Sequence, residues 1–120
     1  MKKHTLPVHP PAADLARVNE LFKALSEPLR LQMMLLLSQT EKTVGELVEA
    51  VGAPQSTVSR HLALLRAAKL VETERHGVSV TYRLADAHLK GLLLEAFSHA
   101  QHERMGLPDH LEGKEAKEPV

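Results

Sequence analysis

The spacing of the hydrophobic residues changes twice along the chain, and this change constrains the fold more than any other feature. Over residues 15–70, apolar side chains recur at spacings of three and four, which is typical of amphipathic helices. Beyond Leu70 the period changes to two, through Val71, Thr73 and Arg75 and then through Val78, Val80, Tyr82 and Leu84. This period indicates strands, with His76 and Gly77 where a hairpin would reverse. From Asp86 the helical spacing returns. The chain is therefore expected to form helices, then a hairpin, then a last helix.

Capping residues predict where the helices begin and end. Ser26 can cap the second helix, with Pro28 in its first turn. Thr43 and Glu46 have the spacing of a capping box, and Gly52 suits the left-handed conformation that ends a helix. The expected helix starts are Ala12, Ser26, Thr43, Pro54 and Asp86, and the expected end of the last helix is Gly106. We therefore predict a mainly α fold with a small β-hairpin, in the order α-α-α-α-β-β-α, a winged helix-turn-helix.

The composition of this 120-residue chain limits what it can do. We expect one domain over residues 12–106, a flexible arm over residues 1–11 and a flexible tail over residues 107–120. The sequence contains no cysteine, which excludes disulfides, thiolate metal sites and a cysteine nucleophile. Its longest apolar stretch is too short to cross a membrane, and nothing resembles a signal peptide. We expect a cytoplasmic protein that is not an enzyme and binds neither membrane nor organic cofactor.

The distribution of charge indicates a local basic surface. The formal net charge of the chain is zero, yet residues 54–83 hold five basic side chains and two acidic ones. Small polar residues at the start of the fourth helix could bond base edges in a major groove, and Arg60 could reach guanine. The expected DNA-contacting residues are Gln55, Ser56, Thr57, Ser59, Arg60 and His61, with Arg75 and His76 at the tip of the hairpin. The alternative is an ordinary solvated helix beside a hairpin.

Four short motifs carry a family resemblance. They are residues 25–31 (LSEPLRL), 44–47 (VGEL), 55–62 (QSTVSRHL) and 70–71 (LV), and taken together they resemble the ArsR/SmtB family of bacterial winged-helix repressors. The resemblance implies a homodimer that is joined through its first and last helices, binds a palindromic operator in double-stranded DNA and leaves it when an inducer binds. The family's frequent Cys-x-Gly-Asp metal motif is missing, since Thr43 stands where its first cysteine would be. A thiolate site for cadmium, lead or arsenite is therefore excluded.

Three of the eight histidines share the last helix with an aspartate. His88 and His99 would lie about 16 Å apart along one helix, so they cannot bind the same ion within one chain. They lie within about 20° of each other around the helix axis, and His102 lies about 60° further round. If two copies packed antiparallel, His88 of one would meet His99 of the other and Asp86 would meet His102. The dimer would then hold two sites, each with one carboxylate and three imidazoles, a donor set that tetrahedral Zn(II) accepts.

The four residues also have ordinary explanations, because Asp86 is well placed as an N-cap and a histidine on a helix surface is usually only solvated. The pattern Asp-x-His-x10-His-x2-His is nevertheless similar to the last-helix metal site of zinc, cobalt and nickel sensors in the same family. That resemblance implies Zn(II), Co(II) or Ni(II) as the inducer, with zinc as our first expectation. Some such sensors recruit terminal histidines to reach six ligands. Possible further ligands here are therefore His4, His9 and His110, although disorder is the simpler expectation for these arms.

We predict derepression by metal, in which the metal-free dimer binds operator DNA and the metal-bound dimer does not. The resemblance implies a link in which His99 donates a hydrogen bond to the backbone carbonyl of Lys69, at the end of the fourth helix. A metal buffer without regulation and a family member with a non-metal inducer are the alternatives. A zinc hydrolase is disfavoured, because four protein ligands close the site and the sequence has no His-Glu-x-x-His pair.

Overall fold

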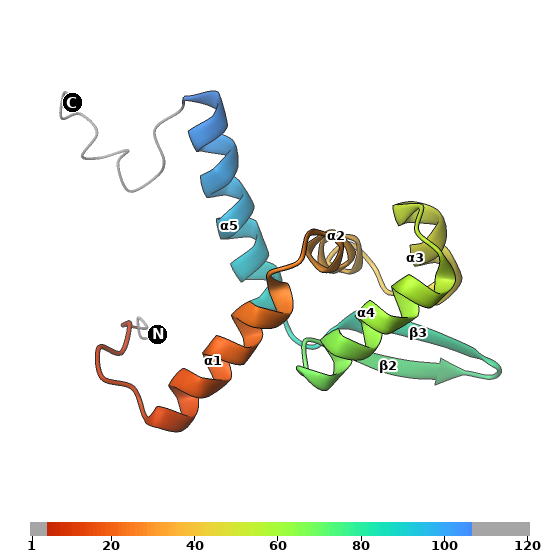
Figure 1. Ribbon diagram of the computed structural model, residues 1–120, viewed down its shortest axis with the longest axis horizontal. Coiled ribbons are helices and arrows are strands. Elements are labelled where there is room, and N and C mark those ends of the chain that lie inside the picture. Colours follow the sequence, from red (N-terminus) through yellow and green to blue (C-terminus); the bar gives the residue numbers. More distant parts are fainter. Residues whose placement is uncertain (1–4, 107–120) are drawn as a thin grey trace. The chain divides into compact units, whose positions relative to one another are not determined.

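The chain folds mainly into helices, with one small sheet (Figure 1). The computed structural model describes residues 5–106 and divides the chain into two compact units, with the boundary between Ala85 and Asp86. The first unit contains α1 (Ala12–Leu25), α2 (Pro28–Leu37), β1 (Lys42–Thr43), α3 (Val44–Val51), α4 (Gln55–Ala67), β2 (Val71–His76) and β3 (Ser79–Leu84). The second contains α5 (Ala87–Met105). The predicted order of helix-turn-helix, hairpin and last helix is confirmed. His4, His110 and the predicted tail lie outside the described residues.

The α2 helix lies in the core of the first unit, as its nearly all-apolar sequence predicts. Met33 and Met34 are fully buried and Leu37 is almost so. The other buried apolar side chains of this unit come from α1, α3, α4, the connection after α4 and the start of β2: Leu25, Leu47, Val58, Leu62, Leu65, Leu70 and Val71. The aliphatic core thus fixes the inner face of α4 and leaves its opposite face to solvent.

The α3 helix begins and ends as predicted. The Thr43 hydroxyl accepts a hydrogen bond from the Glu46 amide at 3.1 Å, while the Glu46 carboxylate accepts one from the Thr43 amide at 2.9 Å. Gly52 ends the helix in the left-handed conformation, with φ at 70°. This reciprocal cap and the left-handed glycine set the short turn between α3 and α4.

The predicted cap of α2 is wrong by one residue. Because α2 begins at Pro28, the capping position belongs to Glu27, whose carboxylate accepts a hydrogen bond from the Leu29 amide at 3.3 Å. Ser26 instead follows α1, and its hydroxyl donates to the Lys23 carbonyl at 2.8 Å. Ser26 therefore ends α1 and does not begin α2.

The sheet has three strands where the sequence predicted two. Strand β1 pairs antiparallel with β3, and β3 with β2, giving the order β1-β3-β2. A two-residue strand is too short to show a hydrophobic period, so β1 left no signal in the sequence. His76 pairs with Ser79 as the last residue of β2, so the reversal lies at Gly77 and Val78, one residue later than predicted. Gly77 takes a left-handed φ of 69° there.

The connection from α4 to β2 passes through a left-handed residue that is not glycine. Lys69 has φ at 62°, and the Leu70 amide donates to the Leu65 carbonyl at 2.9 Å across it. This hydrogen bond closes the end of α4 in the way that glycine usually allows. Lys69 therefore occupies a backbone position that disfavours a side chain.

The α5 helix matches its predicted bounds. The Asp86 carboxylate caps it by accepting from the Leu89 amide at 3.2 Å, and Gly106 ends it with φ at 71°. Leu89 and Leu93 are buried, whereas Leu94 and Phe97 are exposed. Among the described residues, no helix is both long enough and apolar enough to span a membrane.

Candidate nucleic-acid interface and metal ligands

The outer face of α4 carries the small polar residues that the sequence assigned to DNA contact. The helix follows Pro54, which occupies the capping position. Gln55, Ser56, Ser59 and Arg60 are exposed, and Thr57 is half-buried. Val58, Leu62 and Leu65 face the core, and their spacing of three and four residues places them on one side of the helix. The arrangement leaves amide, hydroxyl and guanidinium groups at the start of a helix free to meet base edges or phosphates.

The interpretation of His61 as a DNA-contacting residue is wrong for its side chain, which faces inward. His61 is only 8% exposed, and its Nδ1 lies 2.9 Å from Nη1 of Arg30 on α2. Its spacing could have revealed this, because position 61 is three residues after Val58 and four before Leu65. Burial, then the charge of Arg30, lowers the pKa of His61 below its ordinary value of 6.5, while Glu27 opposes this. The side chain of His61 therefore helps to hold α4 against α2.

The tip of the hairpin presents Arg75 and His76, both exposed. Arg75 pairs with Val80 and His76 with Ser79, so the two side chains project from opposite faces of β2. Val78, which the sequence placed in a strand, is 98% exposed at the turn. The tip thus offers a basic side chain on one face and an imidazole on the other.

One face of the sheet is acidic. The sequence alone showed Glu72 and Glu74 as two acidic residues but did not show that they share a face. The Arg83 guanidinium lies 3.2 Å from the Glu72 carboxylate and 2.6 Å from that of Glu74. Thr81, which pairs with Glu74 across the strands, donates from its hydroxyl to Glu41 at 3.1 Å. Of the five basic residues counted over residues 54–83, Arg83 is therefore engaged by the two acidic ones, and the exposed cations are Arg60, Arg66, Lys69 and Arg75.

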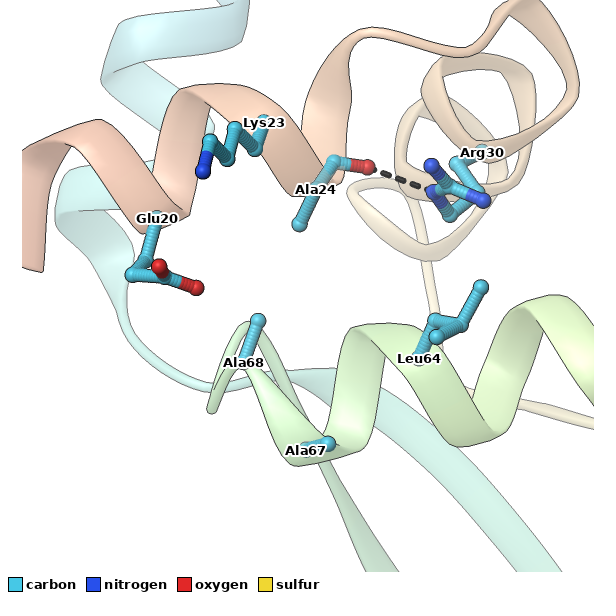
Figure 2. Close-up of a pocket in the computed structure, with 7 residues that line it drawn as sticks. All are labelled: Glu20, Lys23, Ala24, Arg30, Leu64, Ala67 and Ala68. Atoms are coloured by element: carbon cyan, nitrogen blue, oxygen red, sulfur yellow. Dashed lines mark hydrogen bonds between the residues drawn. The ribbon is translucent and has the colours of Figure 1, made fainter.

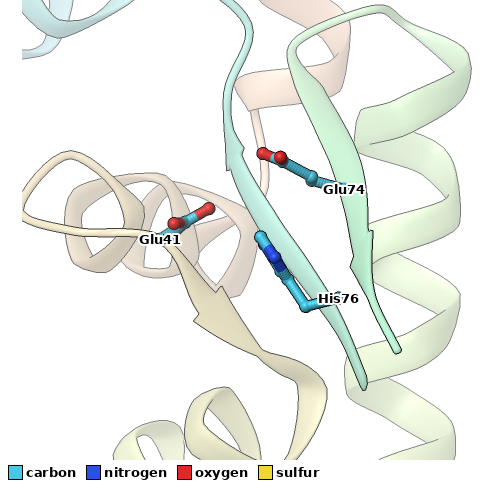
Figure 3. A group of neighbouring side chains, drawn as sticks. All are labelled: Glu41, Glu74 and His76. Atoms are coloured by element: carbon cyan, nitrogen blue, oxygen red, sulfur yellow. The ribbon is translucent and has the colours of Figure 1, made fainter. Parts of the chain in front are cut away.

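Glu41, Glu74 and His76 gather on this acidic face, and Figure 3 shows their side chains pointing toward one another. Within residues 5–106, they are the one group of three histidine or acidic side chains with donor atoms all within 4.8 Å of one another. All three are exposed. Glu41 already accepts from Thr81, and Glu74 from Arg83, so these carboxylates have partners within the sheet itself.

The four predicted metal ligands lie at the two ends of one continuous helix. Asp86 caps α5, and its Oδ1 lies 3.7 Å from Nδ1 of His88, whose side chain is 96% exposed. His99 is exposed and His102 is half-buried, near the other end. Among the residues that the structure describes, these four do not gather their donor atoms within one chain. This agrees with the 11-residue separation of His88 and His99. His9 lies exposed ahead of α1.

Comparisons with known proteins show the family to which the chain belongs. A sequence profile of the bacterial regulatory proteins of the ArsR family matches residues 27–73. The chain is 45% identical over 96 residues to the transcriptional repressor SmtB of Mycobacterium tuberculosis, covering 80% of this chain and 71% of that one. The chain belongs to the ArsR/SmtB family. The regulator NmtR of the same organism is 40% identical, with 78% of each chain covered.

Solved structures agree with this assignment to the ArsR/SmtB family. The homodimeric winged helix-turn-helix DNA-binding domain of a possible ArsR-family regulator from Mycobacterium bovis superposes with a TM-score of 0.72 at 31% identity, covering 82% of this chain and 92% of that one. HlyU of Vibrio cholerae gives a TM-score of 0.64 at 32% identity, covering 75% and 92%. The family and the fold are those of DNA-binding transcription regulators and not of enzymes.

The ArsR profile covers α2, α3, α4 and the beginning of β2, and it ends before α5. Membership of the ArsR/SmtB family rests on this profile together with the relatives, of which SmtB matches 80% of the chain. The proposed metal ligands on α5 rest on their own spacing and chemistry.

Proposed function

We propose that this chain is a metal-responsive transcriptional repressor of the ArsR/SmtB family. Its homodimer binds operator DNA through the outer face of α4 and the hairpin, and it leaves the operator when Zn(II), Co(II) or Ni(II) binds between the α5 helices of two subunits. The observation that carries the proposal is the placement of Asp86, His88, His99 and His102 on one unbroken helix, Ala87–Met105 and its cap. Such a regulator would work in the cytoplasm, where a bacterial chromosome lies.

Exposed apolar side chains on α1 and α5 support the dimer. On α1 they include Leu15, at 61% exposure, and Phe22; on α5 they include Leu94 and Phe97, the latter at 40%. Large hydrophobic side chains left to water at this level favour burial against a partner. The Mycobacterium bovis domain, which is homodimeric, supports the same assembly here.

The chemistry of the four side chains fits a divalent transition-metal ion. One carboxylate and three imidazoles are borderline ligands that suit zinc, cobalt and nickel. Capping by Asp86 is compatible with ligation, because Oδ1 accepts from the Leu89 amide while a carboxylate has a second oxygen to offer. His88, almost fully exposed, has no packing that would hold its ring away from a partner helix. A bound ion would supply the free energy that favours one spacing of the two α5 helices.

The route from α5 to α4 stays a prediction. Its proposed acceptor is the carbonyl of Lys69, the left-handed residue that closes α4. A hydrogen bond from His99 to this carbonyl would act on the end of the helix that reads DNA. His9, and with it His4 and His110 outside the described residues, stay possible ligands for a six-coordinate ion.

A mixed dimer tests the cross-subunit site. One subunit carries His88→Ala and the other His99→Ala, with different affinity tags so that the mixed species can be isolated. If the ligands come from both chains, one site loses two ligands and the other keeps all four. Calorimetric titration with zinc should therefore give one tight site per mixed dimer, against two in the wild type.

The matched control is a dimer that carries His76→Ala, which removes an exposed imidazole from the hairpin and should keep two tight sites. Two weakened sites in the mixed dimer would contradict the cross-subunit geometry. Unchanged zinc binding in the His88→Ala homodimer would remove α5 as the metal site. Induction that stays intact after the histidine substitutions would favour a family member with a non-metal inducer.

A further inference from the structure

The DNA-reading helix is held by arginine side chains that reach it from two other helices. Arg30, near the start of α2, donates from Nε to the carbonyl of Ala24 at 2.6 Å and from Nη1 to Nδ1 of His61 at 2.9 Å. Ala24 lies in the last turn of α1, and His61 lies in the middle of α4. One guanidinium therefore connects the end of α1 to α4.

A second arginine makes the corresponding contact from α1. Arg17 donates from Nη2 to the carbonyl of Ala68, which is the capping residue at the end of α4. Helices α1 and α4 thus each have a carbonyl near the C-terminal end that accepts a hydrogen bond from a guanidinium. The positive charge of that guanidinium also interacts favourably with the negative end of the helix dipole.

The space between these contacts is not filled by side chains. A pocket of about 310 Å³ lies between α1 and α4. Figure 2 shows the residues that line it: Glu20, Lys23, Ala24, Arg30, Leu64, Ala67 and Ala68. The aliphatic core fixes the inner face of α4 through Val58, Leu62 and Leu65. Because apolar packing does not fill the space toward α1, the polar contacts that cross it also contribute to the angle of α4 against α1.

The contact of Arg30 with His61 requires a neutral imidazole. Arginine only donates, so Nδ1 can accept from it only when that nitrogen carries no proton. The charged groups that face His61 are Arg30 on α2, Glu27 just before α2, and Arg60 on α4 itself. Two cations against one carboxylate, together with burial, favour the neutral ring. Protonation would place a third positive charge within hydrogen-bond distance of a guanidinium.

We propose that Arg30 and His61 are positioning residues for operator binding, which set the angle of α4 through a hydrogen bond that exists only while His61 is neutral. The inference rests on the proposed role of α4 in reading the operator. It assigns to His61 an effect on DNA affinity without any contact with DNA, and it makes that affinity fall in mildly acidic solution even in the absence of metal.

Two substitutions of His61 separate positioning from simple packing. His61→Asn keeps a hydrogen-bond acceptor near the position of Nδ1 but cannot be protonated there, whereas His61→Leu fills the space without an acceptor. Operator affinity is measured by fluorescence anisotropy with excess chelator present, so that the α5 histidines hold no metal. At pH 7.5, chosen about one unit above the ordinary histidine pKa, His61→Leu should bind about tenfold more weakly than the wild type, and His61→Asn should stay within about threefold.

The pH profile is the readout that a structural role alone would not move. Between pH 7.5 and about pH 5.5, wild-type affinity should fall relative to that of His61→Asn. His76→Ala is included as a control that removes the exposed imidazole at the tip of the hairpin. Circular dichroism and sedimentation establish for each variant that the fold and the dimer are intact.

A double-mutant cycle covers the case in which His61→Leu weakens the fold. Arg30→Met and His61→Leu should together cost less operator affinity than the sum of their separate effects, since they break the same bond. Additive effects, an affinity of His61→Leu equal to the wild type, or a pH profile shared by wild type and His61→Asn would overturn the inference. A wild-type chain that binds no operator would instead contradict the proposed function itself.

Discussion

Nη1 of Arg83 lies 2.6 Å from Oε1 of Glu74, across neighbouring strands of the hairpin. The same guanidinium is 3.2 Å from Glu72, so one basic side chain is shared between two acidic ones. All three are partly exposed, and exposed ion pairs contribute little to stability. Their main effect is on the charge of this one face of the hairpin, because two carboxylates against one guanidinium leave it with one negative charge.

Removing these carboxylates should strengthen operator binding. The double variant Glu72→Gln, Glu74→Gln frees Arg83 and removes two negative charges from the hairpin. We expect a gain in operator affinity of about 1 kcal/mol or less in low salt, which shrinks as salt screens the charges. The control is Glu95→Gln, which removes an exposed carboxylate from α5 and leaves the charges of the hairpin unchanged. A double variant that binds no better than this control in low salt would contradict the prediction.

Arg60 should contribute directly to DNA contact, because it is exposed on the outer face of α4 next to Ser59. Arg60→Ala should weaken operator binding by about 1–3 kcal/mol if the side chain reads a base, with a smaller effect on non-specific DNA. Arg104→Ala, which removes an exposed arginine from the last turn of α5, is the matched control. Affinity is compared at one fixed salt concentration. Equal losses in the two variants would remove Arg60 from the interface.

Lys69 should be replaceable by glycine with a gain in stability. Its φ of 62° places it in the left-handed region, where a side chain is disfavoured. Lys69→Gly should raise the free energy of unfolding by about 0.5–1 kcal/mol, after the larger entropy of glycine in the unfolded chain is subtracted. Lys69→Ala removes the same charge and keeps the strain, so it should not stabilise the protein. Urea unfolding measures both, and equal stabilities for the two variants would contradict the account.

Local sequence rules predicted most of the helix ends. These rules concern residues within one helical turn, and they account for the Thr43 and Asp86 caps, the left-handed Gly52 and the inward side chain of Val58. The error in the cap of α2 is equally local, because the capping residue is Glu27 and not its neighbour Ser26.

The rest of the site depends on contacts between residues far apart in the sequence. His61 meets Arg30, 31 residues earlier, and Glu41 meets Thr81, 40 residues later. The spacing of residues within one helix or strand does not predict such pairs. The two-residue strand β1 was missed for the same reason, because it is defined by its pairing with Tyr82 and Thr81 on β3.

Stability should fall in mildly acidic solution through His61. Its pKa is lowered in the folded chain, so between that value and the ordinary 6.5 the unfolded chain binds a proton that the folded chain does not. The free energy of unfolding therefore decreases as the pH drops below about 6.5. Urea midpoints from pH 7.5 to about pH 5 should decline more steeply for the wild type than for His61→Asn. Parallel declines would show that burial of His61 does not govern this dependence.

Release of operator DNA by zinc, compared between the wild type and His99→Ala, tests the central claim most directly. His99 is exposed on α5 and does not belong to the unit that carries α4. Without metal, both proteins should bind a labelled operator with similar affinity. Zinc should weaken binding by the wild type by about 1–3 kcal/mol, a coupling typical of allosteric effectors, and should leave His99→Ala unchanged. A His99→Ala protein that zinc still releases from the operator would contradict metal sensing through α5.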